Sequence, residues 1–448
     1  MKPYPKYRDS GVEGLGEVPF HWPIKRLKYL ATCNNDTLPE RTDPDKEIRY
    51  IDISSVVYPY GIQQIEEMFF SDAPSRARRL VKNGDTIVST VRTYLKAIAL
   101  IEEDDNGLVV STGFAVIRPR YLVPNYLSRF LMSYYCVETI ASISVGVSYP
   151  AVNAGDIGNI VALEPPLGEQ QTIAAFLDRE TSRIDALIQK KERMIELLKE
   201  KRIALITQTV TKGLDPIVPM KDSGIEWLGE LPEHWGKKRI KDLLLPKKGA
   251  IKTGPFGSQL LSSEMDDSDV KVYNQKSVIT KDFESGENYI SFKKLETLKE
   301  FQTYPGDFLI TTRGTIGRCA ILPPDSETGI LHPCLMRLQT NKEIVDDRFL
   351  ELLIEESQVV IEQLKLKSNG TTIEVIYQDS LKNVTVFLPP IHEQLSIAAY
   401  LDMKTNKTDL LIYQIETSIS LLREYRASLI HHAVTGKIDL RGYDAQAQ

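Results

Sequence analysis

The sequence PPLGEQQTIAAFLD, at residues 165–178, opens a stretch of about forty residues that contains no further proline or glycine. The same beginning returns as PPIHEQLSIAAYLD at residues 389–402, again followed by about forty residues without proline or glycine. In each copy two prolines stop the preceding strand-like run. Glu169 and Glu393 then fall in the first helical turn, where the helix dipole favours an acid. Each stretch therefore predicts a helix roughly 60 Å long at 1.5 Å per residue.

Apolar residues recur close to every seven positions along both predicted helices, which is the pattern of a coiled-coil seam. One heptad position holds Leu177, Ile184, Leu198 and Leu205 in the first copy, with Lys191 as an interruption, and Leu401, Ile415, Leu422 and Leu429 in the second, with Thr408 as an interruption. Flanking residues that widen the two stripes are Leu187, Ile188, Met194, Ile195, Leu411, Ile412 and Ile419. Each helix could pack on its own domain, or the two could pair. We expect pairing, because both stripes keep one heptad phase to the helix ends.

A second repeat stands near the start of each half. DSGVEGLGEVPFHW begins at Asp9 and DSGIEWLGELPEHW begins at Asp222, with ten of the fourteen positions identical. The separation is far longer than the 20–50 residues of a solenoid unit, so it indicates that half of the protein was duplicated.

Weaker echoes keep nearly the same spacing between these landmarks. NGDTIVST at residues 83–90 corresponds to PGDFLITT at residues 305–312, and SVGVSYPAV at 144–152 corresponds to SNGTTIEVI at 368–376. The central regions otherwise differ and predict mixed α/β domains. Two copies that keep one scaffold while their centres diverge are what a pair of regions reading two different targets would look like.

Composition sets broad limits on the class of protein. The chain has 448 residues, of which 42% are hydrophobic and 26% charged, as in an ordinary soluble globular protein of about three domains. We find no apolar run long enough for a membrane span, and the first ten residues lack the layout of a secretory signal. The four cysteines form no CxxC pair, so we expect buried thiols rather than a zinc site, and a reducing cytosolic location.

The net charge of −6 argues mildly against a nucleic-acid partner, but an acidic chain can carry basic surfaces. Basic groupings occur at Arg76, Arg78, Arg79 and Lys82, at Lys237, Lys238, Arg239 and Lys241, and at Lys247 and Lys248. For each grouping the alternative is a solvated face without a partner.

A catalytic constellation is not found. The chain has no GxxxxGK[ST] phosphate loop, no Asn-Pro-Pro-aromatic methyltransferase motif and no Pro-Asp…Glu-x-Lys nuclease cluster. His21 and His234 recur because their segment recurs, each beside a tryptophan, and we expect them to pack at the domain entrances. These observations favour a protein that binds and positions while another chain does the chemistry.

The combined motifs resemble those of the specificity subunit of type I DNA restriction–modification enzymes, and the resemblance covers essentially the whole chain. It is carried by the two entrance segments, by TGPFGSQL from Thr253, by the helix openings LEPPLGEQQTIAAFLD and LPPIHEQLSIAAYLD, and by the helix ends ITQTVTKGLD and IHHAVTGKIDL. The first copy departs from the pattern, because CNNDTLPERT replaces the GPFGS turn. The resemblance therefore does not say which loops of the first domain reach DNA.

The resemblance implies an α+β protein in which two α/β target recognition domains are joined by two long helices. These helices are expected to form an antiparallel coiled coil, with a pseudo-two-fold internal repeat. The expected parts are a first recognition domain at 1–165, a first helix at 166–212, a second recognition domain at 213–388 and a second helix at 389–440.

The resemblance also implies a function. Each recognition domain would read one half of a bipartite, asymmetric site on double-stranded DNA, and the coiled coil would set the spacing of the halves. Two modification subunits that use S-adenosylmethionine would methylate adenine, and restriction subunits that use ATP and Mg would cleave. This chain would be no enzyme and would bind no cofactor or metal itself. The alternative is a tandem-domain adaptor that binds proteins and has no nucleic-acid role.

Donor type and expected loop position select the candidate DNA contacts, since Arg, Lys, Asn and Gln read bases and Arg and Lys bind phosphates. They are Arg76, Arg78, Arg79, Arg92, Lys96, Ser148 and Tyr149 in the first copy, and Lys252, Gln275, Lys276, Arg313, Arg318, Thr371 and Thr372 in the second. The alternative for each is an ordinary surface residue.

Overall fold

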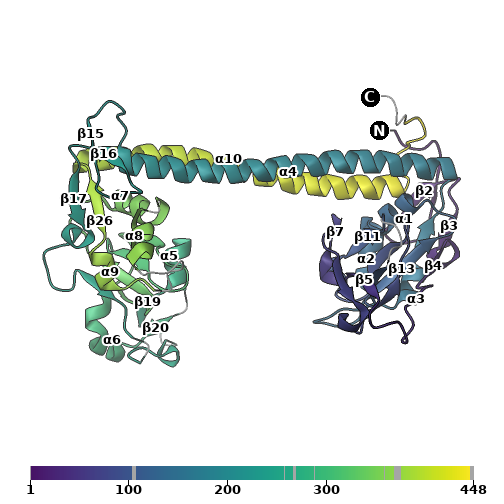
Figure 1. The fold of residues 1–448 in the computed structure, drawn as a ribbon, viewed down its shortest axis with the longest axis horizontal. Coiled ribbons are helices and arrows are strands. Elements are labelled where there is room, and N and C mark those ends of the chain that lie inside the picture. Colours follow the sequence, from purple (N-terminus) through teal and green to yellow (C-terminus); the bar gives the residue numbers. More distant parts are fainter. Residues whose placement is uncertain are drawn as a thin grey trace. The chain divides into compact units, whose positions relative to one another are not determined.

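The chain folds into two compact units in the computed structural model (Figure 1). The model describes residues 2–102, 107–256, 258–265, 269–286, 288–357, 359–367 and 375–443. The first unit comprises Met1–Glu192 and Glu416–Gln448, and the second comprises Arg193–Ile415. Each unit holds one β-rich domain and a part of each of two long helices.

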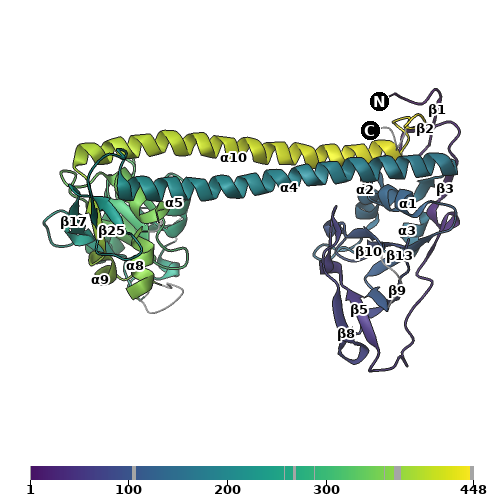
Figure 2. The ribbon, with the colours of Figure 1, turned by 45° about the horizontal axis from the view of Figure 1, so that its top comes forward.

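The two long helices are α4, Leu167–Lys212, and α10, Ile391–Val434, which confirms both predicted helices. In the first unit Asp185 of α4 pairs with Arg426 of α10, and Glu192 of α4 pairs with Arg423 of α10. Residue numbers thus rise along α4 while they fall along α10, so the helices are antiparallel. The second unit has the corresponding contact between Arg202 and Asp409. Figures 1 and 2 show the two helices side by side within each unit. The predicted antiparallel pairing is thus confirmed inside each unit.

Most of the predicted seam is buried. The buried members are Leu177, Ile184, Ile188 and Ile195 on α4, and Leu401, Ile412, Ile415, Ile419 and Leu429 on α10. The prediction that Leu187, Met194 and Leu411 widen the stripes was wrong, because they are 42%, 45% and 37% exposed. Each stands one residue before a buried isoleucine, and one residue turns the side chain by roughly 100° around a helix of 3.6 residues per turn.

The domain of the first unit contains two four-stranded sheets. The first has the order β11 (Ile98–Leu100), β10 (Thr86–Ser89), β13 (Phe114–Pro119) and β4 (Ala31–Cys33), and all its pairs are antiparallel. The second has the order β8 (Glu66–Phe69), β5 (Glu47–Ile51), β12 (Leu108–Ser111) and β9 (Ala77–Leu80), with β5 and β12 parallel. The helices are α1 (Pro124–Leu131), α2 (Tyr134–Ile143) and α3 (Ala154–Asn159). Buried valines and isoleucines of both sheets form a shared core.

The domain of the second unit repeats this topology. Its first sheet has the order β23 (Cys319–Ile321), β22 (Phe308–Thr311), β25 (Leu335–Leu338) and β18 (Ile251–Thr253). Its second has the order β20 (Tyr289–Ile290), β19 (Val270–Tyr273), β24 (Gly329–Leu331) and β21 (Gln302–Thr303), again with β19 and β24 parallel. Helices α5 (Gln275–Thr280), α6 (Phe292–Leu298), α7 (Asp347–Glu351), α8 (Val359–Lys367) and α9 (Gln378–Lys382) complete it. The matching strand order confirms the duplication that the sequence predicts.

Short two-stranded pairs frame each domain. They are β1 (Tyr7–Asp9) with β2 (Glu17–Pro19) and β3 (Ile24–Arg26) with β14 (Val161–Leu163) in the first unit, and β15 (Met220–Asp222) with β16 (Glu230–Pro232) and β17 (Gly236–Arg239) with β26 (Thr385–Leu388) in the second. The repeated entrance and helix-opening motifs are thus ordered structure on both sides of each domain.

The repeated His-Trp and Glu motifs form one structural device. Glu169, in the first turn of α4, accepts hydrogen bonds from the buried Trp22 indole at 3.0 Å and from the Tyr4 hydroxyl at 2.9 Å, and it pairs with His21 at 2.7 Å. The second unit repeats the contacts of the tryptophan and histidine with Glu393. The contacts of His21 with Glu169 and of His234 with Glu393 confirm the prediction that these histidines pack at the entrances. A carboxylate in the first turn also suits the helix dipole.

Candidate nucleic-acid interface

Four segments of the first domain, at residues 76, 90–91, 112–113 and 151–152, are joined by backbone hydrogen bonds and bridges, and we call them the strip. The Thr112 N–H donates to the Arg76 carbonyl at 2.8 Å, and the Thr90 N–H donates to the Gly113 carbonyl at 2.7 Å. The Val152 N–H in turn donates to the Thr90 carbonyl at 2.8 Å. The strip therefore places the loops at 90–96 and 144–152 beside each other and close to Arg76.

The second domain carries the same strip at the positions that the repeat predicts. The Thr312 N–H donates to the Cys334 carbonyl and the Ile376 N–H donates to the Thr312 carbonyl, both at 2.8 Å. The bridge between Val91 and Ala151 in the first unit corresponds to the bridge between Arg313 and Val375 in the second. One backbone frame is thus presented twice, with different side chains.

Two of the predicted contacts of the first domain come together on its strip. The Arg92 guanidinium lies 5.3 Å from the ring centroid of Tyr149, and both side chains are exposed. Ser148 is the exposed neighbour of Tyr149 in the same loop. Arg92 and Lys96 both adopt left-handed backbone conformations with φ of 52°, and Lys96 pairs with Glu138 at 3.8 Å. Arg92 is therefore a predicted cation that the strip presents to solvent.

The basic grouping at 76–79 separates into three different environments. Arg76 donates to the Tyr50 hydroxyl at 3.2 Å and to Asp52 at 3.0 Å, and these contacts raise the pKa of its guanidinium. Arg78 lies over the Phe70 ring at 4.7 Å. Arg79 is half-buried, and burial lowers the pKa of its guanidinium. Of the three, Arg76 lies at the strip, so the sequence grouping does not correspond to one basic surface.

The predicted contacts of the second domain are distributed in a similar way. Arg313 is exposed, and its carbonyl accepts from the Gln275 amide at 2.9 Å, as the Thr315 carbonyl does at 3.1 Å. Gln275 thus braces the strip, and the exposed Lys276 follows it in α5. Lys252 is engaged elsewhere, with Glu300 at 2.5 Å and over the Phe301 ring at 4.7 Å. Thr371 and Thr372 lie outside the described residues.

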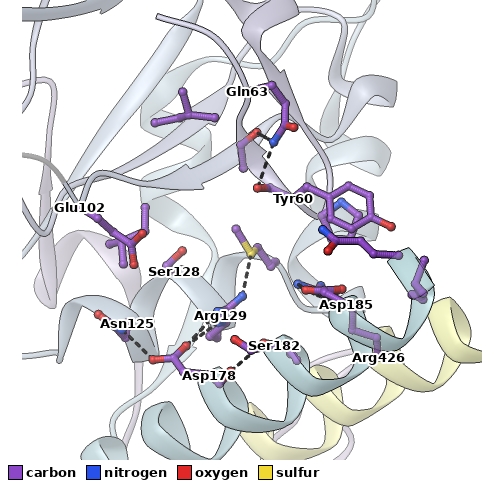
Figure 3. A pocket seen from close by; sticks show the side chains of 18 of the residues that line it. Tyr60, Gln63, Glu102, Asn125, Ser128, Arg129, Asp178, Ser182, Asp185 and Arg426 are labelled. Atoms are coloured by element: carbon purple, nitrogen blue, oxygen red, sulfur yellow. Dashed lines mark hydrogen bonds and ion pairs between the residues drawn. The ribbon is translucent and has the colours of Figure 1, made fainter. Parts of the chain in front are cut away.

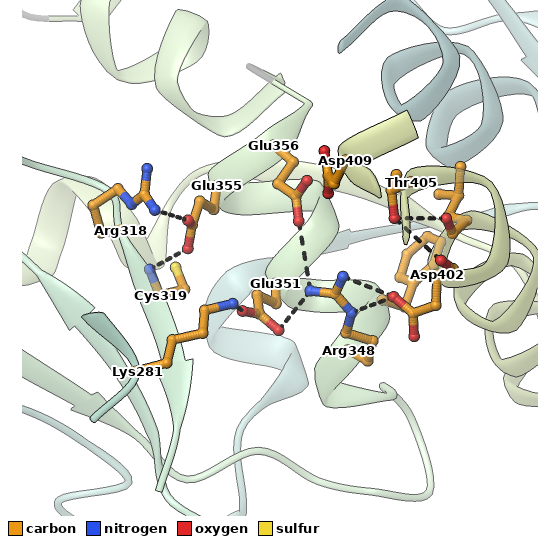
Figure 4. Close-up of polar contacts among 12 residues, drawn as sticks. Lys281, Arg318, Cys319, Arg348, Glu351, Glu355, Glu356, Asp402, Thr405 and Asp409 are labelled. Atoms are coloured by element: carbon orange, nitrogen blue, oxygen red, sulfur yellow. Dashed lines mark hydrogen bonds and ion pairs between the residues drawn. The ribbon is translucent and has the colours of Figure 1, made fainter. Parts of the chain in front are cut away.

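Arg318 is 43% exposed, but its guanidinium is held in a network of ion pairs (Figure 4). Its guanidinium pairs with Glu355 at 2.9 Å, and that carboxylate also accepts from the Cys319 N–H at 2.6 Å. Burial raises the pKa of Glu355. Because an acid faces its guanidinium, Arg318 is a weaker candidate for a phosphate or base contact than Arg313.

The same network reaches the long helices. Glu351 contacts Lys281 and accepts from Arg348 at 2.8 Å, and Arg348 pairs with Asp402 of α10 at 2.7 Å. Glu356, in the π-helical segment Leu352–Glu356, pairs with Arg202 of α4 at 2.5 Å. It also pairs with Arg348 at 3.5 Å (Figure 4). The second domain is thus joined to both helices by ion pairs, which sequence analysis missed because the partners come from distant segments.

Comparison with known proteins identifies the family. Residues 22–197 and 232–421 match the family model for the type I restriction modification DNA specificity domain. The chain belongs to this family. Each of the two matched ranges combines one β-rich domain with most of the long helix that follows it in the chain.

Relatives that match over most of the chain are specificity subunits. The putative type I restriction enzyme MjaX specificity subunit of Methanocaldococcus jannaschii is 23% identical over 95% of this chain and 96% of its own length. The EcoKI specificity subunit of Escherichia coli (strain K12) is 21% identical over 72% of this chain and 68% of its own.

Solved structures share the fold. One chain of a type I R-M system, solved in work on complex assembly and conformational transition, has a TM-score of 0.70 at 24% identity and covers 94% of this chain and 99% of its own. The HsdS subunit of Thermoanaerobacter tengcongensis has a TM-score of 0.55 at 23% identity, with 95% and 100% covered. At these identities the likeness shows the fold alone.

A cleft of about 830 Å³ lies in the first unit between its specificity domain and the long helices (Figure 3). Its walls come from the hairpin β6 (Val56–Val57) and β7 (Gly61–Ile62), from α1, and from α4 and α10. Arg129 and Asn125 both reach Asp178 of α4 at 2.8 Å on its floor. The signal that could have found it is Asp178 itself, because the repeated motif IAAFLD/IAAYLD carries this aspartate in both specificity domains.

Metal and membrane sites are not evident in the described parts of the chain. Over those residues, no group of three or more His, Cys, Asp or Glu side chains could hold a metal ion. The four cysteines are unpaired, with Cys136 and Cys319 buried and Cys33 and Cys334 half-buried, and burial raises the pKa of the Cys136 thiol to about 12. Within the same described ranges, no helix combines the length and the apolar character needed to cross a bilayer.

Proposed function

We propose that this chain is the sequence-recognition subunit of a type I restriction–modification complex. Each specificity domain would read one half of a bipartite, asymmetric site on double-stranded DNA. The observation that carries the proposal is the strip found in both units. It keeps one backbone pattern at 90–91 and 312–313 but presents Arg92 over the ring of Tyr149 in one unit and Arg313 braced by Gln275 in the other. A duplicated frame with unlike readers suits a target with two unlike halves.

The spacing of the two half-sites would be set by α4 and α10. Half-sites read on one face of B-DNA lie roughly 34–36 Å apart for each helical turn. Helix α4 has 46 residues, which corresponds to about 70 Å at 1.5 Å per residue. The paired helices are therefore long enough to act as a spacer. We propose the division into recognition domains at 1–165 and 213–388 and spacer helices at 166–212 and 389–440.

The partners would supply the chemistry. Two modification subunits with S-adenosylmethionine would dock on the repeated frame and methylate an adenine in each half-site. Restriction subunits with ATP and Mg would cleave. In this proposal the chain has no catalytic residue and binds no cofactor, and it works in the cytoplasm. A repeated frame supports two docking surfaces for identical partners, since similar surfaces bind similar subunits.

The test uses the complex with its modification subunits. Methylated adenines are mapped on DNA, and binding of a target duplex is measured over a range of salt concentrations. We expect a split motif methylated on both strands, with affinity that falls steeply as salt rises. Arg92→Ala should weaken binding by roughly 1–2 kcal/mol, as for loss of a base or phosphate contact. Arg318→Ala is the matched control and should weaken it less, because Glu355 already holds that guanidinium.

Two results would contradict the proposal. Methylation confined to an unsplit site would remove the spacing role of the helices. Absence of specific, salt-dependent DNA binding by the assembled complex would favour a tandem-domain adaptor that binds proteins.

A further inference from the structure

The loops beside the strip of the first unit carry several exposed apolar side chains. In the loop at 144–150, Val145, Val147 and Tyr149 are 80%, 101% and 67% exposed. The neighbouring loop at 90–96 adds Tyr94, which is 56% exposed. Valine is among the residues most often buried, and a contiguous apolar patch on a soluble domain marks a binding surface.

The apolar loop is held in one shape. Val145 and Ala151 exchange two backbone hydrogen bonds, at 2.8 and 3.0 Å, which closes a short ribbon with Val147 at its tip. Gly146 has φ of +116°, and a Cβ there would lie 3.0 Å from the Tyr149 carbonyl oxygen, so the turn requires glycine. The Ser144 hydroxyl meets the Thr93 hydroxyl at 2.9 Å and ties the ribbon to the other loop. Val147 is therefore presented to solvent by a braced support.

We infer that Val147, at the tip of this ribbon, reads thymine methyl groups in the major groove of the half-site bound by the first unit. The inference rests on the proposed function and deepens it by naming a chemical feature of the target.

The chemistry of DNA selects this ligand. The thymine C5-methyl is the apolar group that base edges display in the major groove, and that groove admits a two-stranded ribbon. A valine side chain has no donor or acceptor, so it can distinguish base pairs only through such a methyl. The Arg92 guanidinium beside Tyr149 supplies the positive charge that a nucleic acid requires. Side chains that wedge between base steps in the minor groove are usually longer, such as Phe, Leu, Ile or Met.

The second unit differs at the corresponding places. Arg313 takes the position of Val91 in the strip, and the position of Val147 in the repeat is occupied by Thr371. Thr371 lies outside the described residues, and it carries a hydroxyl group, able to donate or accept a hydrogen bond, beside its methyl group. The inference therefore concerns the half-site bound by the first unit alone.

The experiment measures binding of the assembled methyltransferase complex to its target duplex, with each thymine replaced in turn by deoxyuridine. This replacement removes only the methyl group. Wild type should lose about four-fold in affinity at one or two thymines of one half-site, as expected for one apolar carbon returned to water. Val147→Ala should weaken binding of the thymine duplex and bind the thymine and deoxyuridine duplexes equally. Ile217→Ala is the control, because Ile217 is 87% exposed but lies outside both strips, and it should behave as wild type.

The outcomes separate the two proposals. If specific binding persists but no deoxyuridine replacement matters, or if the replacement matters equally in Val147→Ala, the thymine inference is overturned and the proposed function stands. If the complex shows no specific DNA binding, the proposed function fails and the inference fails with it.

Discussion

One ion pair occurs twice in this molecule, and the two copies have different surroundings. Asp185 pairs with Arg426 in the first unit, and Asp409 pairs with Arg202 in the second. Asp409 lies 224 positions after Asp185, and Arg426 lies 224 positions after Arg202, so the two pairs correspond in the repeat. Arg426 is only 4% exposed and binds both carboxylate oxygens of Asp185. The duplication has kept this contact between the long helices in both units.

The domain residues that lie beside the long helices differ between the two units. Gln170 accepts from the Val123 N–H and Gln394 accepts from the Asp346 N–H, which makes Val123 and Asp346 counterparts at an offset of 223 positions. At that offset Glu355 and Glu356 correspond to uncharged residues, Met132 and Ser133. The second unit thus places the ion pairs of Glu355 and Glu356 beside its helices, whereas the first unit has a cleft there, next to the pair of Arg129 and Asp178. The comparison teaches that the helix pairing and the Gln170 and Gln394 contacts are shared by the two units, and that the other side chains between each domain and its helices are free to change.

Removing the buried arginine should have the largest effect. Arg426→Ala leaves Asp185, 24% exposed, facing the cleft without its cation, and should reduce the free energy of unfolding of the first unit by about 3–4 kcal/mol. Urea denaturation of the full chain, followed by hydrogen exchange in peptides of α10, measures this loss.

The adjacent surface pair provides the control for that experiment. Arg423 pairs with Glu192 with both side chains about half exposed, at 52% and 47%, so Arg423→Ala should cost no more than about 1 kcal/mol. Equal losses for the two variants would show that the buried pair is not special to the scaffold.

Replacing the glycine that follows each long helix should reduce the free energy of unfolding by different amounts in the two units. Gly436 follows α10 with φ of +72°, and a Cβ there would lie 2.3 Å from Pro19 of the entrance segment. Gly213 follows α4 with φ of +77°, but the nearest atom to its added Cβ would be a Glu393 carboxylate oxygen at 3.1 Å, which is a much milder overlap. Gly436→Ala should therefore destabilise its unit by about 2–3 kcal/mol, and Gly213→Ala by about 1–2 kcal/mol, mostly from the left-handed backbone.

Thermal unfolding of both glycine variants, with wild type in parallel, tests this difference. A larger loss of stability for Gly213→Ala would contradict this reasoning. It would mean that Pro19 and Trp22 of the entrance segment move aside for a Cβ at position 436.

The scaffold could be predicted from the sequence because its signals are periodic and repeated. The helices follow from the heptad stripes and from the absence of proline and glycine, and the two domains follow from the recurring landmarks. The errors at Leu187 and Met194 arose because a stripe read from hydrophobicity alone does not fix which side of a helix faces its partner. One residue of phase decides between burial and exposure.

The site could be predicted only in part, because a sequence does not show which cations are already paired. The sequence predicts both Arg92 and Tyr149 as contacts, but no pattern in it shows that these residues, 57 positions apart, lie against each other. The charge of Arg318 makes it a candidate in the sequence, but its acidic partner Glu355 comes from a different segment. Long-range pairing therefore decides which of several similar arginines remains available to a ligand.

The smallest expected effect is a pH dependence of stability that occurs at His431 in the first unit and not at its counterpart in the second. His431 of α10 packs beside the rings of Tyr134 and His432, and burial, together with the charges of His432 and Lys437, lowers its pKa from 6.5 to about 4. Its counterpart 224 positions earlier is Thr207, whose hydroxyl donates to the Ser357 carbonyl at 3.1 Å. The unfolded chain binds a proton at His431 below pH 6.5 while the folded chain does not, so stability present above that pH is lost as the pH falls toward 4.

Because His431 is partly exposed, solvent screening should limit this loss to roughly 1 kcal/mol. Hydrogen exchange at pH 7 and pH 5, corrected for the intrinsic rate, should show weaker protection at residues 428–437 at the lower pH. Residues 350–357 should not follow, because the raised pKa of the buried Glu355 has the opposite sign and favours the folded state as the pH falls. His431→Thr places the second-unit residue in the first unit and should abolish the difference; if the acid response of residues 428–437 survives that substitution, another group controls the pH dependence of this helix end.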